Sequence, residues 1–340
     1  MKIRYFLIII LMLSLPWLFS CKKNQYRINI SGISADIHAL RLENDLFRPD
    51  PAALRDSLQA LKNKYGSFLQ YFSYVIRAGN VNDSSFIDYL TDFCTNKLNN
   101  EVFTAVSGAY PDMASIENDL SLAFRHFRYY FPSEPVPLVY TCITGFNRSI
   151  ITADSVLGIS LDRYLGRDCE YYPQLEIYGY ISARMNSWNI APDCMYAWGA
   201  RMSPFEDMNY SSDNVLAEMI HEGKLRYFEK CMLPHLNDTV LFGFTGDQMN
   251  FCRNNEGRMW TYLIENDLLF STDKFTIRKL TGESPFTSYF TNESPGRAAV
   301  WLGFRIIEKY MSGNRDVSLS EMMKFTDVQT ILDKAKYSPQ

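Results

Sequence analysis

The chain contains few histidines, only 4 among 340 residues. Catalytic schemes that use an imidazole as general base therefore have few candidates. The sequence also lacks a Ser/His/Asp arrangement, a phosphate-binding glycine loop and a dinucleotide-binding fingerprint. The common hydrolase, nucleotide-binding and oxidoreductase classes are thus left without a sequence signature.

Cysteine is present, but no two cysteines form a Cys-x-x-Cys pair. A zinc knuckle and a thioredoxin-like redox centre are therefore unsupported. An oxidising compartment would allow disulfides, and Cys169 with Cys194, both in loop-like sequence, is the first pair to test. The alternative is that the thiols are free and buried as small apolar groups. Besides Cys21, the cysteines are Cys94, Cys142, Cys169, Cys194, Cys231 and Cys252.

The sequence has no basic stripe that would indicate a nucleic-acid partner. Its formal net charge is −4, and removal of residues 1–20, which carry Lys2 and Arg4, would bring it to −6. With 47% hydrophobic and 15% aromatic residues, the chain can bury a large core. We expect one large domain or two tightly packed ones.

No apolar run is long enough to span a bilayer, which takes about 20 residues. The longest run, from Tyr5 to Phe19, follows the positive residues Lys2 and Arg4 and precedes Cys21. This arrangement resembles a lipoprotein signal peptide, in which the cysteine is lipidated and becomes the first mature residue. We expect residues 1–20 to be the signal peptide and Cys21 to attach the chain to a membrane. The alternative is an ordinary cleaved signal with a chance cysteine.

The first third of the chain has the periodicity of helices. Asp50 and Pro51 have the form of an N-cap and first helical residue, and Gly66 ends the apolar pattern. A second helix is expected from Ser84, and a third ends at Pro132. The apolar stripes are Leu54, Leu58, Leu61 and Tyr65; Phe86, Leu90 and Phe93; and Ile116, Leu120, Phe124, Phe127 and Phe131.

Three short runs rich in β-branched residues then predict strands over 136–144, 148–153 and 155–161. We interpret residues 166–210 as loops and short helices, and expect helices again from Asp213 to Met311. Ser318 with Glu321 has the form of a capping box. The predicted fold class is α+β, mostly helical, with a small antiparallel sheet before the helix that carries His221. The expected organisation is a tether over 21–40 and a single domain over 41–340, made of parts 41–132, 133–212 and 213–340.

His221 and Glu222 form half of a zinc-protease motif. A complete His-Glu-x-x-His helix places two imidazoles one turn apart, where both bind Zn²⁺ while the glutamate activates a water. Leu225 occupies the position of the second imidazole. The sequence therefore predicts no metal site and no catalytic residue, and the alternative is a zinc-dependent peptidase or hydrolase with atypical ligands.

Two further residues complete this degenerate site in the sequence-based hypothesis. Glu256 falls 31 residues after Leu225, on an apolar stripe that directs its carboxylate inward, where it needs a partner. Lys224 is long enough to reach the vacated metal position and is predicted to pair there with Glu222 or Glu256, the alternative being a solvated surface charge.

Several other residues are weaker candidates. Tyr227 and Trp260 are possible lining residues of a residual cleft, as is Tyr196. Arg297, close to an expected helix start, is a candidate to bind an acidic group, with capping as the alternative. The aromatic residues are equally compatible with a place in the core.

A set of short segments, in the same order along the whole chain, carries a family resemblance. These segments are the lipoprotein start, Asp45-Leu46-Phe47, 64–68, 158–166, Glu222-Gly223-Lys224 with Tyr227-Phe228, Asn255-Glu256 with Trp260, 293–297 and Trp301-Leu302-Gly303. With them the chain resembles the gliding-motility lipoprotein GldB family of Bacteroidetes. The resemblance implies a membrane-anchored accessory factor for gliding, without established catalysis and without a cofactor beyond the lipid on Cys21. The order of elements also resembles that of the zincins, which implies a degenerate zincin-like, gluzincin-like fold.

The resemblance also implies a place in the cell. In such lipoproteins an acidic run after the cysteine marks export to the surface, and Lys22, Lys23, Asn24 and Gln25 follow Cys21 instead. We therefore expect attachment to the outer membrane, facing the periplasm. The expected partners are the lipid membrane and an unidentified cell-envelope protein or peptide.

Overall fold

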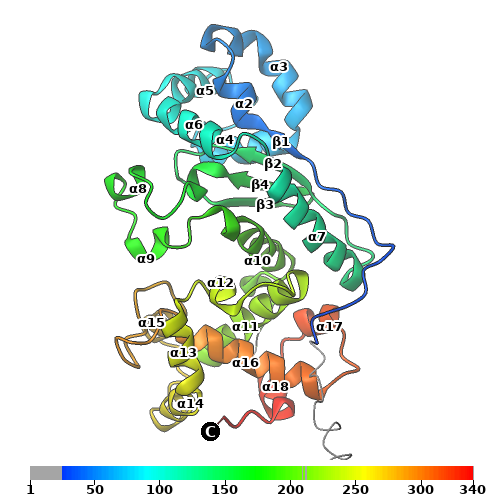
Figure 1. The fold of residues 1–340 in the computed structure, drawn as a ribbon, viewed down its shortest axis with the longest axis vertical. Coiled ribbons are helices and arrows are strands. Elements are labelled where there is room, and N and C mark those ends of the chain that lie inside the picture. The colour runs from blue at the N-terminus through cyan, green and yellow to red at the C-terminus, as the bar shows by residue number, and fades with distance from the viewer. Residues whose placement is uncertain (1–24, 209, 211–212, 340) are drawn as a thin grey trace, which may run out of the picture.

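The computed structural model describes residues 25–208, 210 and 213–339. The expected signal peptide and Cys21 lie outside these residues. A layer of short helices covers one side of a small sheet, and the longer helices of the second half of the chain lie on the other side (Figure 1). The first layer consists of α2 (Leu42–Phe47), the 3-10 turn η2 (Pro51–Ala53), α3 (Leu54–Tyr65), α4 (Ser67–Val75), α5 (Phe86–Thr95) and α6 (Lys97–Ala109).

In the first layer the predicted helix stop is confirmed, but the predicted start is wrong. Pro51 opens the 3-10 turn η2, and α3 begins only at Leu54, with Ala53 rather than Asp50 at the N-cap. Gly66 adopts a φ of 52° between α3 and α4, a conformation that glycine enters at little cost. Leu54, Leu61 and Tyr65 are buried on one face of α3. Beyond α6, α7 (Ala114–Tyr130) ends just before Pro132, as expected.

The sheet is mixed, so the expectation of an antiparallel sheet is wrong for most of it. Its four strands are β1 (Ala39–Arg41), β2 (Leu138–Cys142), β3 (Ile150–Ala153) and β4 (Val156–Ser160), in the order β1-β2-β4-β3. Only β3 and β4 pair antiparallel, with Ile151 opposite Gly158. β1 and β4 both pair parallel to β2. The β1 pairing joins residues 100 positions apart, such as Ala39 and Val139, which local sequence cannot indicate.

Residues 21–40 were expected to be a tether, but their described part packs along α7. Arg125 donates to the backbone oxygens of Ile30 and Ile33, and Ser121 Oγ accepts from the Ile37 amide at 2.9 Å. Tyr26, like Ile37, is buried. The described residues from Tyr26 to Ile37 are therefore docked on the folded body rather than forming a free tether.

The region 166–210 contains a longer helix than the sequence indicated. α10 (Ile190–Met202) follows the short elements η3 (Leu161–Tyr164), α8 (Tyr171–Gln174), α9 (Gly179–Ser182) and η4 (Ser187–Asn189), and precedes η5 (Phe205–Asp207). Ile190, Cys194 and Trp198 are among its many buried residues. A helix buried over most of its surface has no polar face and therefore no clear period.

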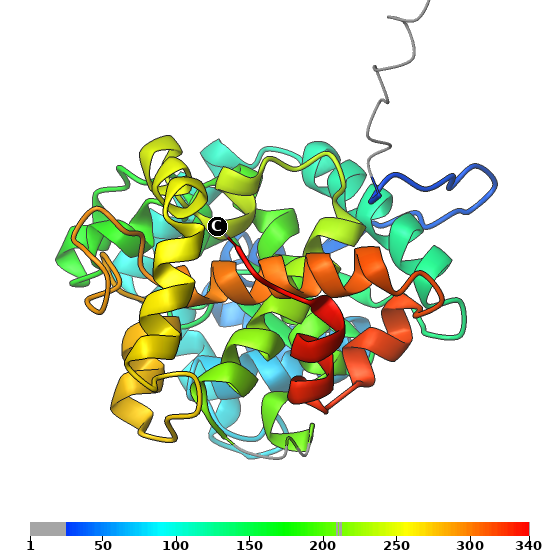
Figure 2. The ribbon, with the colours of Figure 1, turned by 90° about the horizontal axis from the view of Figure 1, so that it is seen from below.

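The second half of the chain forms a layer of helices around α11 (Val215–Met232) and α16 (Ala298–Gly313). Seen from below, α16 runs across the layer, with α13 and α14 at one end and α17 and α18 at the other (Figure 2). The capping box of Ser318 and Glu321 is present, as predicted. The remaining helices are α12 (Asp238–Phe242), α13 (Gly246–Asn254), α14 (Glu256–Glu265), α15 (Lys274–Thr281), α17 (Leu319–Lys324) and α18 (Val328–Ala335).

Two glycines allow α11 and α16 to touch backbone to backbone. A Cβ atom on Gly223 would lie 2.3 Å from the carbonyl carbon of Gly303, and one on Gly303 would lie 1.8 Å from the Met219 oxygen. Neither contact is sterically possible without separating the helices. Both glycines fall in segments of the family resemblance, so their role there is to set this crossing.

The core divides into two apolar clusters on the two faces of the sheet. The first-layer helices pack with Tyr140 and Ile151 in one cluster, while Val139 and Ile159 belong to the larger cluster of the second half. Residues Cys94, Cys142, Cys169, Cys194, Cys231 and Cys252 are free thiols, so the Cys169–Cys194 disulfide is not formed. Within the described residues, no helix combines the length and apolarity that crossing a bilayer requires.

Candidate functional site

The partial motif of His221 and Glu222 lies in the interior of the molecule. α11 begins after Asn214, whose side chain accepts a hydrogen bond from the Ala217 amide at 2.9 Å. From Val215 to Met232, almost every residue of the helix is buried. Leu225, at the position of the lost imidazole, is 1% exposed. The helix is therefore part of the core rather than one wall of an open cleft.

His221 is held by aromatic neighbours. Its Nδ1 lies 3.1 Å from the Tyr210 hydroxyl, and the Phe205 ring meets the imidazole edge-on at 5.1 Å. Burial, followed by the nearby charge of Lys224, lowers the pKa of His221 to about 4. The imidazole is thus neutral at physiological pH.

Lys224 does not pair with Glu222 or Glu256, so the sequence-based hypothesis is wrong on this point. Its ammonium instead donates to the backbone oxygen of Phe325, just after α17, and lies 3.4 Å from the Tyr210 hydroxyl. The alternative of a solvated surface charge is also wrong, because Lys224 is 1% exposed. Burial lowers its pKa to about 7. The side chain ties α11 to the segment between α17 and α18.

Glu222 lies on a different side of α11 from His221 and Lys224. Its carboxylate accepts a hydrogen bond from the Tyr196 hydroxyl of α10 at 2.8 Å. Burial, followed by the charge of Glu222, raises the pKa of Tyr196. Glu222 therefore joins α10 to α11.

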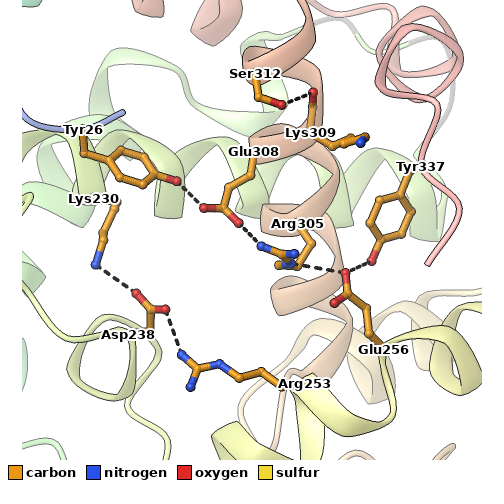
Figure 3. A network of polar contacts seen from close by, with 10 residues as sticks. All are labelled: Tyr26, Lys230, Asp238, Arg253, Glu256, Arg305, Glu308, Lys309, Ser312 and Tyr337. Atoms are coloured by element: carbon orange, nitrogen blue, oxygen red, sulfur yellow. Dashed lines mark hydrogen bonds and ion pairs between the residues drawn. The ribbon is translucent and has the colours of Figure 1, made fainter. Parts of the chain in front are cut away.

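Glu256 is directed inward and has partners, as its place on the apolar stripe predicted. Its carboxylate accepts from Arg305 of α16 at 3.2 Å and from the Tyr337 hydroxyl at 2.8 Å (Figure 3). Arg305 also contacts Glu308, which in turn accepts from Tyr26. One network thus joins α14, α16, the C-terminal segment and the start of the described chain.

The motif residues do not assemble a metal site among the described residues. There, no group of three or more His, Cys, Asp or Glu side chains is placed to hold an ion. A catalytic zinc ion usually takes three protein ligands and a water. His221 contacts Tyr210, whereas Glu256 contacts Arg305 and Tyr337. The two residues that could act as zinc ligands under the peptidase alternative therefore bind different partners and do not meet. These residues do not fit a zinc ion.

The possible cleft residues are packed rather than open. Tyr227 is 6% exposed, with the ring of Tyr26 at 5.4 Å, and Trp260 is 8% exposed against Tyr337 at 5.1 Å. Tyr196, by contrast, lines a cavity of about 270 Å³. The cavity lies on the Glu222 side of α11.

We call this space the arginine-lined cavity, because four arginines from separate segments contribute to its wall. Two carboxylates, Asp193 of α10 and Glu283 after α15, line it as well. Its arginines are Arg163 of η3, Arg184 after α9, Arg226 of α11 and Arg297, which precedes α16.

Sequence reasoning found part of this cavity. Tyr196 and Arg297 were candidates, whereas Arg184 and Asp193 have no local motif and meet only through the fold, at 3.0 Å. Arg226 carried a usable signal, since it follows Glu222 by four residues and therefore shares its helix face. The other lining arginine, Arg163, follows the predicted strand 155–161 and has no motif that would indicate a site.

Comparisons with known proteins agree with the resemblance seen in the sequence. The family described as Gliding motility protein GldB matches residues 23–339, almost the whole chain. No curated protein matches the chain. No solved structure matches it either. On the extent of the family match, the chain belongs to the Gliding motility protein GldB family.

Proposed function

We propose that this chain is a non-catalytic binding protein of the cell envelope, anchored through a lipid on Cys21 to the periplasmic side of the outer membrane. It binds a cell-envelope protein or peptide and acts as an accessory factor of gliding motility where the host glides. One observation carries the proposal: each ionisable side chain of the former motif is bonded to another part of the same chain.

These contacts support a structural role for the motif. A catalytic zinc site keeps an open coordination position for water or substrate. Here His221 contacts Tyr210, Glu222 accepts from Tyr196, and Lys224 donates to a backbone oxygen. Each contact joins α11 to a neighbouring segment, so the helix organises the fold and binding is left to the surfaces around it.

The position of Tyr26 supports an orientation on the membrane. Tyr26 contacts Glu308 of α16 and follows Cys21 by five residues, which is at most about 18 Å of extended chain. A lipid on Cys21 would therefore hold the end of the molecule that carries α16 and α18 close to the bilayer. α2 to α6 lie at the opposite end of the long axis (Figure 1), where an envelope partner can reach them.

We interpret the fold as a degenerate zincin. The order of the elements supports this interpretation: N-terminal helices, a sheet, a helix with His221 and Glu222, and a later helix with Glu256. The tightly packed Leu225, at the position of a second imidazole, is a departure from an active enzyme. The zincin relationship therefore remains a prediction about ancestry, while the proposed function is binding.

The proposal is tested by variants that remove the former motif but keep the anchor. We expect His221→Gln and Glu256→Gln to retain motility or membrane association at matched protein levels, because neither group takes part in chemistry. Cys21→Ala should release the protein from membranes, as measured by fractionation. Cross-linking from membranes, followed by mass spectrometry, should recover the same partner with the parent and with both motif variants.

The alternative of a zinc-dependent hydrolase gives the opposite results. One tightly bound zinc per chain, lost in His221→Gln together with function while the melting temperature stays near that of the parent, would overturn the proposal. So would a peptidase activity of the purified parent that the same substitution abolishes.

A further inference from the structure

The arginine-lined cavity is built from five parts of the chain that are distant in sequence. Arg163 comes from η3, Arg184 from the segment after α9, Arg226 from α11 and Arg297 from the start of α16, while Asp193 of α10 completes the wall. A site assembled in this way depends on the whole fold of the second half. It is also separate from the His221 side of the motif helix.

The arginines are only partly compensated by acidic groups in the wall. Arg184 pairs with Asp193 at 3.0 Å, and Arg297 pairs with Glu283 at 3.1 Å. The Glu283 side chain is 54% exposed, so this pair is weakened by solvent. Within the described part of the chain, Arg163 forms no ion pair, and its guanidinium contacts Ser149 Oγ at 3.2 Å and the Phe146 oxygen at 3.4 Å.

Arg226 lies deepest in the wall, with a side chain that is 2% exposed. It pairs with Glu229 at 2.7 Å and donates to the Leu241 oxygen at 3.0 Å, while its buried Nε has no hydrogen-bond partner. Burying a guanidinium without full hydrogen bonding is costly. Glu229, its acidic partner, is itself fully buried, which raises the pKa of the carboxyl to about 7.

The arginines act on one another across the cavity. The pKa of Arg297 is lowered to about 10, first by burial and then by the charges of Arg226 and Arg184, against the opposite effect of Glu283 and Glu222. The positive groups therefore outweigh the negative ones at this point of the wall. An anion inside the cavity would relieve this repulsion.

Size and lining restrict what can enter. The volume of about 270 Å³ is slightly below the usual range for drug-sized ligands, about 300–1,000 Å³. Ile181 and Met185 give the wall an apolar part beside the tyrosines and arginines. Guanidinium groups bind carboxylate and phosphate oxygens through paired N–H donors. The space suits one small oxyanion with a short apolar extension.

We propose that the arginine-lined cavity binds an oxyanion, a carboxylate or a phosphate group, carried by a small ligand or by the end of a larger one. This inference rests on the proposed binding role, because it names the ligand class of that role. Arg163 and Arg184 bind the anion from the side of the sheet, and Arg297 binds it from the start of α16.

Titration of the detergent-solubilised full chain tests the inference. Succinate and inorganic phosphate are titrated by calorimetry at constant ionic strength, with sodium chloride as the reference. We expect saturable binding of about one anion per chain, and the tighter of the two probes identifies the ligand as a carboxylate or a phosphate. Arg163→Gln should weaken this binding about tenfold or more. Arg167→Gln is the matched control, since Arg167 is 66% exposed and lies outside the wall.

A second variant keeps the test decisive if Arg163→Gln unfolds. Arg297→Lys retains the charge but loses the guanidinium fork, so it should also weaken binding while Arg167→Gln leaves it unchanged. Heats no larger than those of chloride for both probes would overturn the inference. The inference would also be overturned if folded Arg163→Gln and Arg297→Lys bound the anion with the same affinity as the parent. This experiment measures neither motility nor cross-linking. Absence of anion binding would therefore leave the accessory role in place, and loss of the accessory role would not affect the result of the anion titration.

Discussion

The two sides of the sheet differ in the kind of side chain that they bury. In the first layer, α2 to α5 are closed by apolar side chains such as Phe68 and Phe72, and among the described residues their buried charged side chain is Glu43. The Glu43 carboxylate forms an ion pair with Arg41 at 2.7 Å and accepts a hydrogen bond from the Thr141 hydroxyl at 2.8 Å. This layer is an ordinary hydrophobic core.

The second half of the chain buries many more ionisable groups. They gather on α11, where the helix also crosses α16 at backbone contact. Because each buried charge costs free energy unless it is fully paired, such a concentration is poorly explained by stability alone. The contrast indicates that polar contacts help to define the packing of the second half, whereas apolar burial closes most of the first layer. The buried charged and histidine side chains of α11 are His221, Lys224, Arg226, Glu229 and Lys230.

The largest effect is expected at the helix crossing. In Gly303→Val, the new side chain would meet the Met219 backbone, with a Cβ contact of 1.8 Å, far beyond the overpacking that costs about 1–3 kcal/mol. We expect no stably folded protein, as judged by soluble yield and far-ultraviolet circular dichroism. Gly313→Val on the same helix is the control, because a Cβ there meets nothing within 4 Å. Similar losses in both variants would show that helix propensity, rather than the crossing, sets the cost.

The next effect sharpens the contrast between buried and exposed charge. Arg226→Met leaves Glu229 buried without its partner, and breaking such a pair from one side costs about 3–5 kcal/mol. In the first layer, Arg55 and Asp88 form a pair at 2.6 Å whose side chains are 65% and 67% exposed, so Arg55→Met should cost at most about 1 kcal/mol. Urea unfolding measures both differences. Adding Glu229→Gln to Arg226→Met should recover part of the lost free energy of unfolding. If Arg226→Met and Arg55→Met destabilise the protein equally, buried and exposed ion pairs do not differ in the way proposed.

The features predicted from sequence are those that neighbouring residues determine. The stop at Gly66, the end of α7 before Pro132, the strands β2 to β4 and the capping box at Ser318 all depend on local periodicity or capping. The inward direction of Glu256 followed from the same reasoning. For such features a single sequence is sufficient.

The failures concern groups that meet only in three dimensions. β1 joins the sheet across almost the whole first layer, and β2 pairs parallel with β4 rather than with its neighbour in sequence, β3, which makes the sheet mixed. Lys224 had an acceptor that the sequence could not reveal, the backbone oxygen of Phe325, 101 residues away. α10 was missed because burial on most sides removes the polar face that marks a helix. The arginine-lined cavity likewise needs segments from Arg163 to Arg297.

The smallest effect is a dependence on pH that Lys224 should give to the second half. Burial lowers its pKa from 10.5 to about 7, so between these values the unfolded chain binds more protons than the folded one. The free energy of unfolding therefore gains a contribution that increases as the pH rises from about 7 toward 10, on the order of 1 kcal/mol per pH unit. Below pH 7 this contribution is constant.

Urea unfolding of the parent and of Lys224→Met between pH 7.5 and 9.5 measures this contribution. Other groups titrate there too, since buried cysteines and tyrosines have raised pKa values, but they are common to both proteins and cancel in the difference. As the pH rises, the free energy of unfolding of the parent should increase relative to that of Lys224→Met. The Lys97 side chain is 92% exposed, so the difference in free energy of unfolding between the parent and Lys97→Met should not change with pH. If the Lys224→Met difference is constant as well, the ammonium reaches solvent in solution. The second half would then bury less charge than its contacts indicate, and its contrast with the first layer would rest on Arg226 and Glu229.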